Sequence, residues 1–255
     1  NGANWLANKK KLKHWSLGFM KKIVLIGNDT LHRRFLINSL LDKNYELIGC
    51  IFETKRAKPS FEVGPVFEEK EKIFLQEEFS KHTRLDLNRL ECWHYESANS
   101  EKCINKIQEL NPDLCIVSGA GLIYEKTIQA FPDGLINIHL GNAVEYRGLD
   151  TNLWAIYHND FENIGVTIHF IDTELDTGDV ITYKKVNISN ITKIHQLRFF
   201  EMHLASELLQ SALDDYFKGN LVAKRQEKKG RYYSFMPKDL KRLVAKKFDN
   251  RIKNI

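Results

Sequence analysis

The chain has 255 residues, of which 43% are hydrophobic and 11% aromatic, enough to fill the core of one sizeable domain with an appendage. Its four cysteines lack metal-ligand spacing and the density of a disulfide-stapled domain, so we expect a protein of the reducing cytoplasm. No apolar run approaches the roughly 20 residues that a membrane-spanning helix needs, so no membrane partner is expected.

The net charge of +5 is concentrated at the two ends of the chain. Residues 1–19 contain four lysines and no acid, and residues 224–255 contain twelve basic and three acidic residues. The body between them is therefore acidic, which disfavours a nucleic-acid groove. We expect a solvated basic tail, and we interpret residues 1–19, which precede Met20 and show no amphipathic period, as a leader or added segment.

From residue 20 onward, apolar strands alternate with helices. Strands are expected at 23–27, 46–53, 91–95, 114–117 and 135–137, and helices at 30–42, within 66–80, at 99–110 and at 124–130. This alternation predicts an α/β protein with a Rossmann-like, mostly parallel sheet flanked by helices. Ligands of such sheets bind beyond the carboxyl ends of the strands, so polar motifs that follow strands are candidates for a site.

The pattern changes after residue 140. A short helix is expected at 151–158, strands at 165–171 and 179–188, and a long helix at 192–217 whose apolar residues repeat at helical spacing. Gly219 and Asn220 end that helix, and a basic segment with one hairpin around Gly230 follows. We therefore divide the chain into a leader at 1–19, a main domain at 20–218 and a small C-terminal extension at 219–255.

The segment from Gly27 to Thr30 joins the first strand to its helix, where a dinucleotide-binding fold places its glycine-rich loop. Only one of the three glycines of G-x-G-x-x-G is present, which argues against a dinucleotide. The N-terminus of the helix can still receive a single anion, but a plain turn is the favoured interpretation.

Asn137 and His139 lie two residues apart at the end of a strand, so their side chains face the same side. An amide can stabilise charge on a carbonyl oxygen, and an imidazole can move a proton near neutral pH. Taken alone, such a pair is more often structural. Further on, Asp172, Glu174 and Asp176 lie in a loop without the spacing of an EF-hand, so a turn is favoured over a metal site.

Together these segments resemble the folate-dependent formyltransferases. The resemblance covers about residues 113–182, where the motifs occur in matching order: Val117-Ser-Gly-Ala-Gly-Leu-Ile123, Phe131-Pro-Asp-Gly-Leu-Ile-Asn137, Asn137-x-His139, Tyr146-Arg147-Gly148, Trp154, Gly165-Val-Thr-x-His169 and Leu175-Asp176-x-Gly178. It implies the formyltransferase fold and the transfer of a formyl group from 10-formyltetrahydrofolate to a primary amine.

The resemblance also implies the roles of individual residues. His139 would stabilise an oxyanion or move a proton, Asn137 would hold the formyl oxygen, and Asp176 would fix His139 and raise its basicity. His169 matches a family position but is interpreted as structural, and no metal is implied. The implied folate-binding residues are Gly119, Ala120, Gly121, Leu122, Ile123, Asp172 and Gly178, and the implied substrate-binding residues are Tyr146, Arg147, Gly148 and Trp154.

One departure affects the loop after His139. Asn142-Ala143-Val144 stands where many members of the family have Leu-Leu-Pro, which puts the geometry of the acceptor side in question. The three residues of the implied catalytic trio are all present.

The acceptor amine is expected to be a nucleotide-linked amino sugar, because His139-Leu-Gly141, Tyr146-Arg147-Gly148 and Thr151-Asn152-Leu-Trp154 are most similar to members that act on such sugars. Arg147, or Lys55 with Arg56, would meet its phosphates. Four alternatives stay open: a glycinamide ribonucleotide enzyme, a methionyl-tRNA enzyme, a formyltetrahydrofolate hydrolase, or a non-catalytic binding module. The methionyl-tRNA enzyme is disfavoured, because we expect its C-terminal barrel to need more than the 36 residues from Asn220 onward. The mixed apolar and basic C-terminal segment is compatible with a homodimer.

Overall fold

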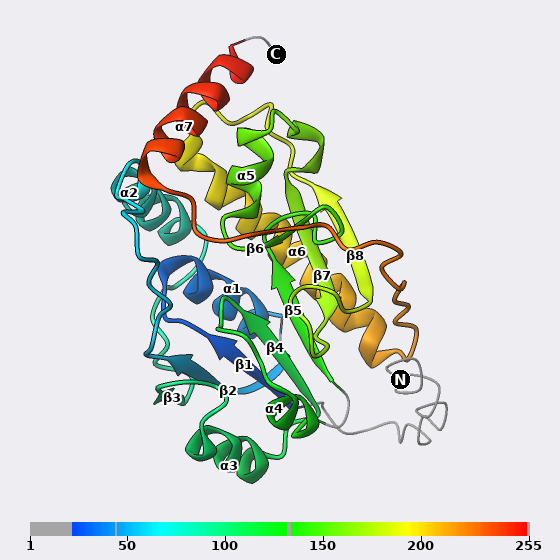
Figure 1. Cartoon of the computed structure of the whole chain (residues 1–255). Helices are drawn as coiled ribbons and strands as arrows, with labels where there is room; N and C mark the ends of the chain where they lie inside the picture. Colours follow the sequence, from blue (N-terminus) through cyan, green and yellow to red (C-terminus); the bar gives the residue numbers. More distant parts are fainter. Residues whose placement is uncertain (1–21, 44, 132–133, 254–255) are drawn as a thin grey trace.

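A computed structural model describes residues 22–43, 45–131 and 134–253, so the expected leader at 1–19 lies outside the described residues. The first half of the chain alternates strands and helices, as the sequence predicts (Figure 1). Its elements are β1 (Lys22–Gly27), α1 (Leu31–Leu41), β2 (Glu46–Glu53), α2 (Glu68–Ser80), β3 (Cys92–Tyr95), α3 (Glu101–Leu110), β4 (Leu114–Ser118), α4 (Glu125–Gln129) and β5 (Leu135–His139).

The second half begins with a short strand and then returns to the main sheet. Its elements are β6 (Tyr146–Gly148), α5 (Thr151–Tyr157), the 3₁₀ helix η3 (Phe161–Asn163), β7 (Gly165–Phe170), β8 (Val180–Lys185), the 3₁₀ helix η4 (Ile194–Gln196), α6 (Leu197–Phe217), β9 (Arg231–Tyr233) and α7 (Lys238–Ile252). None of the helices in the described ranges is long and apolar enough to cross a membrane.

The main sheet has the strand order β3-β2-β1-β4-β5-β7-β8. Strands β1 to β5 run parallel, and β7 and β8 add an antiparallel edge. The chain builds outward from β1 in one direction through β2 and β3, and in the other through β4 and β5. The order therefore reverses between β1 and β4, the place where α/β sheets bind their ligands. The predicted Rossmann-like fold, with a mostly parallel sheet flanked by helices, is confirmed.

Both faces of the sheet are buried, which explains the continuous apolar runs of the central strands. In β1, Ile23 and Leu25 belong to the hydrophobic cluster that also contains residues of α1, α2 and α6, whereas Val24 and Ile26 belong to the cluster of α3 and α4. Successive side chains of a strand point to opposite faces, so one short strand contributes to both layers of core.

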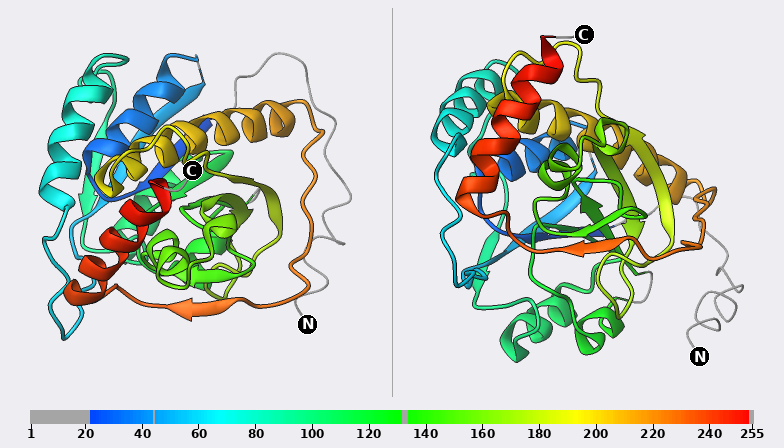
Figure 2. Two further views of the ribbon diagram at one scale, coloured as in Figure 1. Left: turned by 90° about the horizontal axis from the view of Figure 1, so that it is seen from above. Right: turned by 45° about the horizontal axis from the view of Figure 1, so that its top comes forward.

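The C-terminal extension differs from the predicted hairpin and solvated tail. Strand β9 pairs in parallel with β6, and a 15-residue helix, α7, follows it. Residues 219–237, which we call the strap, cross the molecule from the end of α6 to the start of α7 (orange in Figure 2). Val244 and Phe248 of α7 are fully buried in the larger core cluster. The solvated-tail prediction is therefore wrong, because the segment ends in a helix whose apolar side chains pack into the core.

We expect the packing of α7 to contribute measurably to stability. Phe248→Ala removes a fully buried ring, so it should lower the free energy of unfolding by about 3–5 kcal/mol in urea denaturation. Lys246→Ala, an exposed position on the same helix, should change it by less than about 0.5 kcal/mol. Equal effects of the two substitutions would contradict the packing of α7 on the domain.

Candidate active site

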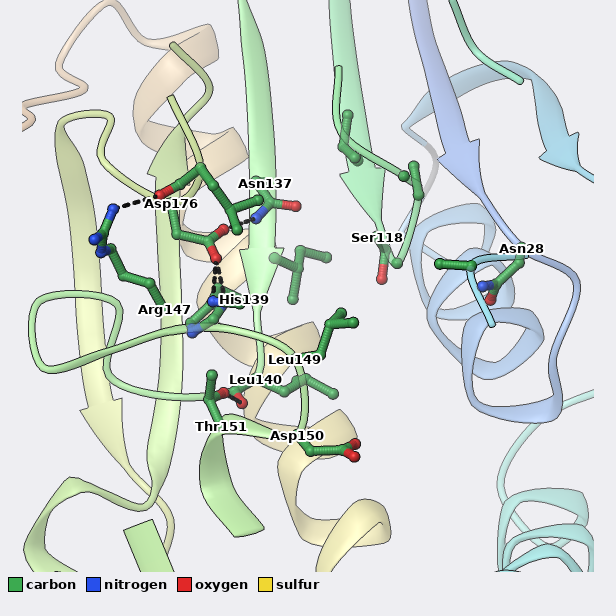
Figure 3. A pocket seen from close by; sticks show the side chains of 18 of the residues that line it. Asn28, Ser118, Asn137, His139, Leu140, Arg147, Leu149, Asp150, Thr151 and Asp176 are labelled. Carbon is green, nitrogen blue, oxygen red and sulfur yellow. Dashed lines mark hydrogen bonds and ion pairs between the residues drawn. The ribbon is translucent and has the colours of Figure 1, made fainter. Parts of the chain in front are cut away.

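A large cavity lies beyond the carboxyl ends of β1, β4 and β5, beside the point where the strand order reverses (Figure 3). Its volume is about 840 Å³, within the range of pockets that hold cofactor-sized ligands. Residues from α1, α5, α6, the turn after β4 and the loop after β7 form its walls. No group of three or more metal-ligating side chains is found within the described ranges.

The carboxylate of Asp176 lies at the centre of the polar side chains in this cavity. The backbone N–H of Gly148 donates a hydrogen bond to Oδ2 at 2.8 Å, and Nδ2 of Asn137 donates to Oδ1 at 3.4 Å. Nδ1 of His139 lies 3.5 Å from Oδ2, and Nε2 of His169 lies 3.6 Å from Oδ1. The structure thus brings together the three residues that the sequence implies as a catalytic trio, and adds His169 to them.

The tautomer of His139 follows from its contact with the first residue of β6. Nε2 lies 2.9 Å from the carbonyl oxygen of Tyr146, which can only accept, so Nε2 carries the proton and Nδ1 faces Asp176. Burial lowers the pKa of His139, and the negative charge of Asp176 only partly offsets that effect. His139 is therefore neutral at pH 7, with a basic Nδ1 beside a carboxylate.

Asp176 stays ionised in spite of its burial. Burial by itself raises its pKa, but its contacts with His139 and His169 and the hydrogen bond from the N–H of Gly148 together hold it well below the ordinary value. A fixed negative charge beside Nδ1 stabilises the imidazolium form of His139, so proton uptake at this atom becomes easier.

His169 determines which way the amide of Asn137 points. Nδ1 of His169 donates to the carbonyl oxygen of Phe170 at 2.7 Å, so its Nε2 accepts the hydrogen bond from Nδ2 of Asn137 at 3.0 Å. The amide nitrogen therefore faces His169 and Asp176, and the amide oxygen points away from them into the cavity (Figure 3). Asn137 offers the cavity an acceptor, whereas the resemblance implied a donor to the formyl oxygen.

The residues implied to bind folate lie at the cavity with one exception. The backbone N–H of Gly121 donates a hydrogen bond to the carboxylate of Glu53 at 2.5 Å, and this bond fixes the turn after β4. The sequence did not predict this role of Glu53. Gly178 does not line the cavity; a Cβ there would lie 1.8 Å from the carbonyl oxygen of Phe170, so it is needed for packing. Those that line the cavity are Gly119, Ala120, Gly121, Leu122, Ile123 and Asp172.

The predicted substrate-binding residues divide into two groups. Arg147 and Gly148 line the cavity, but Tyr146 and Trp154 do not. The ring centroids of Tyr146 and Trp154 lie 5.6 Å and 4.9 Å from that of Tyr233, so these aromatic residues attach the strap to the domain. The aromatic residues of this region that do line the cavity are Tyr232 and Phe235, both from the strap, which a prediction of a solvated tail could not include.

The far end of the cavity holds two arginines with different surroundings. Arg198 forms an ion pair with Glu201 at 2.9 Å, so its charge is matched. Arg33 donates to the carbonyl oxygen of Ser118 at 2.5 Å and to the hydroxyl of Thr30 at 2.9 Å, and no carboxylate of the described residues lies within 4 Å of it.

The environment of Arg33 is cationic. Burial, with the positive charges of Arg198 and Arg56, lowers the pKa of Arg33 to about 9, so the guanidinium remains charged at neutral pH. It lies against the turn after β4, where a Cβ on Gly119 would be 1.5 Å from Nη2. The site therefore places an unpaired positive charge between the ends of β1 and β4.

The contact between Asp176 and His139 predicts the direction of a titration. Because the Asp176 charge favours the imidazolium, Asp176→Asn should move the midpoint of the His139 titration, followed by NMR of its ring protons, to lower pH. Asp172→Asn, an exposed position of the same loop, should leave the midpoint unchanged. A midpoint that moved to higher pH in Asp176→Asn would show that the two side chains do not interact as described.

The model of the family described as "Formyl transferase" matches residues 20–212. The methionyl-tRNA formyltransferase of Clostridioides difficile (strain 630) is 28% identical over 220 residues, which cover 85% of this chain and 65% of that enzyme. In the methionyl-tRNA formyltransferase of Borreliella burgdorferi (strain ZS7), the matched part covers 45% of the enzyme. The chain thus spans less than two thirds of the length of these relatives.

Solved structures share the fold at low sequence identity. A sugar N-formyltransferase from Shewanella sp FDAARGOS_354 superposes with a TM-score of 0.59 and 18% identity, covering 85% of this chain and 77% of the other. The formyltransferase PseJ from Anoxybacillus kamchatkensis, solved with UDP-4,6-dideoxy-4-formamido-L-AltNAc and tetrahydrofolate, has a TM-score of 0.53 and 20% identity, covering 84% and 85% of the two chains. The match of a family model to most of the chain establishes that it belongs to the formyl transferase family.

Proposed function

We propose that the protein transfers a formyl group from 10-formyltetrahydrofolate to a primary amine of a nucleotide-linked amino sugar. The observation that carries this proposal is the convergence of Asn137, His139 and Asp176 at one cavity of a chain that belongs to the formyl transferase family.

The wall around the turn after β4 suits the formyl donor, which is a substrate of the reaction. Ala120, Leu122 and Ile123 present an apolar surface, to which Ile171, a member of the same hydrophobic cluster as Ala120 and Ile123, adds. A flat pterin ring fits such a surface, with backbone groups of the turn at its polar edge. Glu53 holds this backbone in place through the N–H groups of Ala98 and Gly121.

The three polar side chains have different roles in the proposed transfer. An attacking amine has to be neutral, and the amide oxygen of Asn137 can accept one of its N–H groups and thereby aim its lone pair at the formyl carbon. When the new C–N bond forms, the amine nitrogen must lose a proton, which Nδ1 of His139 accepts. Asp176 stabilises the resulting imidazolium through its charge.

The same proton completes the reaction. The folate nitrogen leaves with the electron pair of the breaking C–N bond and receives the proton that His139 holds, so His139 returns to its neutral form. The products are a formamide and tetrahydrofolate, with no net change in the enzyme. The fixed Nε2–H of His139, bonded to the carbonyl of Tyr146, keeps Nδ1 as the atom that exchanges the proton in both steps.

Three features of the far end of the cavity support a nucleotide-linked sugar as the acceptor. Arg33 provides an unpaired positive charge for a phosphate, and Arg56 lies at the same cavity. Oδ1 of Asn28 is buried and has no hydrogen-bond partner within the described ranges, so it can accept from a sugar hydroxyl. Tyr232 and Phe235 provide aromatic surface on the strap.

Methionyl-tRNA is the second candidate acceptor. Methionyl-tRNA formyltransferases are similar in sequence to this chain, and the enzyme of Clostridioides difficile is 28% identical over 220 residues. The solved sugar N-formyltransferases share the fold at lower identity. The chemistry at Asn137, His139 and Asp176 would be the same for both acceptors, so only the acceptor itself separates them.

A panel of acceptors tests the proposal. The protein is incubated with 10-formyltetrahydrofolate in parallel reactions that contain a nucleotide-linked amino sugar, methionyl-tRNA, glycinamide ribonucleotide or no amine. The masses of the products are measured by mass spectrometry. We expect a nucleotide-linked amino sugar to gain the mass of one formyl group, and His139→Ala to abolish that gain while remaining folded. Formylation of methionyl-tRNA alone would favour the second candidate, and formate release without an amine would favour a hydrolase; either result would contradict the sugar acceptor.

Arg33 should affect the acceptor more than the donor. Removing one charged hydrogen-bonding partner costs about 1.5–3 kcal/mol, so Arg33→Met should raise the KM for the nucleotide-linked acceptor about 10-fold to 100-fold and leave the KM for the folate nearly unchanged. Lys184→Met is the matched control, because Lys184 is exposed, pairs with Glu207 and does not line the cavity. An unchanged acceptor KM in a folded Arg33→Met protein would show that Arg33 does not bind the acceptor.

A further inference from the structure

The backbone of Asp176 adopts a conformation that needs support from its surroundings. Its φ is +52°, in the left-handed region that residues other than glycine rarely occupy. This conformation costs roughly 1–2 kcal/mol, and it persists only where neighbouring groups hold it. The position of the carboxylate beside His139 therefore depends on whatever fixes the peptide groups on either side of residue 176.

A single side chain of the strap binds the peptide group that follows Asp176 and a second one two residues further along the loop. Nε2 of Gln226 donates to the carbonyl oxygen of Asp176 at 3.0 Å and to that of Gly178 at 2.8 Å. The two N–H bonds of the amide are thus both used on the loop. Oε1 of the same amide is buried without a hydrogen-bond partner within the described ranges, which is unfavourable by itself. The amide is therefore oriented by its two donor contacts and not by its oxygen.

The strap is attached to the body on both sides of Gln226. Before it, Lys224 and Val180 exchange two backbone hydrogen bonds of 2.8 Å each. After it, Lys229 forms an ion pair with Glu174, and β9 pairs with β6. Gln226 consequently sits on a segment that is tied at both ends, so its amide cannot move without the strap.

Arg147 provides a second link between the strap and the same loop. Its Nε donates to the carbonyl oxygen of Gly230 at 2.8 Å, and its Nη1 donates to that of Leu175 at 3.2 Å. The carbonyl groups of Leu175, Asp176 and Gly178 thus all accept from side chains that belong to the strap or are bonded to it.

We propose that the strap is a positioning element of the active site and that Gln226 is the positioning residue that holds the Asp176 carboxylate against His139. Without the Gln226 donors, the peptide groups around Asp176 can turn, and the left-handed residue can relax toward a more favourable conformation. The carboxylate then leaves the vicinity of Nδ1 of His139. The consequence for catalysis rests on the proposed function, but the geometry can be tested without any substrate.

Gln226→Met tests the geometry, because methionine has nearly the shape of glutamine and no donor. We expect the midpoint of the His139 ring-proton titration to move to lower pH, by part of the displacement that we expect for Asp176→Asn. Glu227→Gln is the matched control, since residue 227 is the exposed neighbour on the strap, and it should leave the midpoint unchanged. A wild-type midpoint in folded Gln226→Met would overturn the proposal, whatever the acceptor of the enzyme is.

Turnover provides the second measurement. A displaced catalytic group lowers the rate more than it lowers binding, so kcat of Gln226→Met should fall about 10-fold to 100-fold, with both KM values within a factor of about three. Gln226→Asn keeps a donor on a shorter side chain and should recover part of kcat, which also tests the idea if Gln226→Met does not fold. A wild-type kcat in folded Gln226→Met would contradict a positioning role. A kcat of Gln226→Asn no higher than that of Gln226→Ala would contradict it as well.

Discussion

The buried negative charge of Asp176 is the constraint on which the rest of the site depends. A carboxylate removed from water is unfavourable by several kcal/mol unless donors and opposite charge surround it. Here the donors are the N–H of Gly148 and the amide of Asn137, and the partner that can take up positive charge is His139. Because burial keeps His139 neutral while Asp176 favours its protonated form, one ring can accept and return a proton within a single reaction cycle.

The topology explains why residues so distant in sequence meet at this carboxylate. The carboxyl end of β5 delivers Asn137 and His139, and the antiparallel pairing of β5 with β7 places His169 opposite Asn137. The loop that follows β7 returns Asp176 to the same end, and the strap then closes over that loop through Gln226. The reversal of strand order between β1 and β4 provides the space beside this cluster in which a second ligand can meet Arg33.

The sequence predicts the parallel strands and the proximity of Asn137, His139 and Asp176, because buried strands and short polar motifs are local signals. It fails for the C-terminal extension for a physical reason. The pairing of β9 with β6 joins residues far apart in the chain, and the basic residues of α7 conceal the apolar spacing of Val244 and Phe248. Arg33, Tyr232 and Gln226 could not be assigned before the fold was known, because nothing in their local sequence differs from an ordinary helix or tail.

The central claim is that His139 and Asp176 act as one unit in moving a proton. A double-mutant cycle measures this most directly, with single-turnover formyl transfer followed for the wild type, His139→Gln, Asp176→Asn and the double variant. We expect the double variant to be about as slow as the slower single variant, because each substitution disables the same proton transfer. Losses that multiplied in the double variant would show two independent contributions and would contradict it.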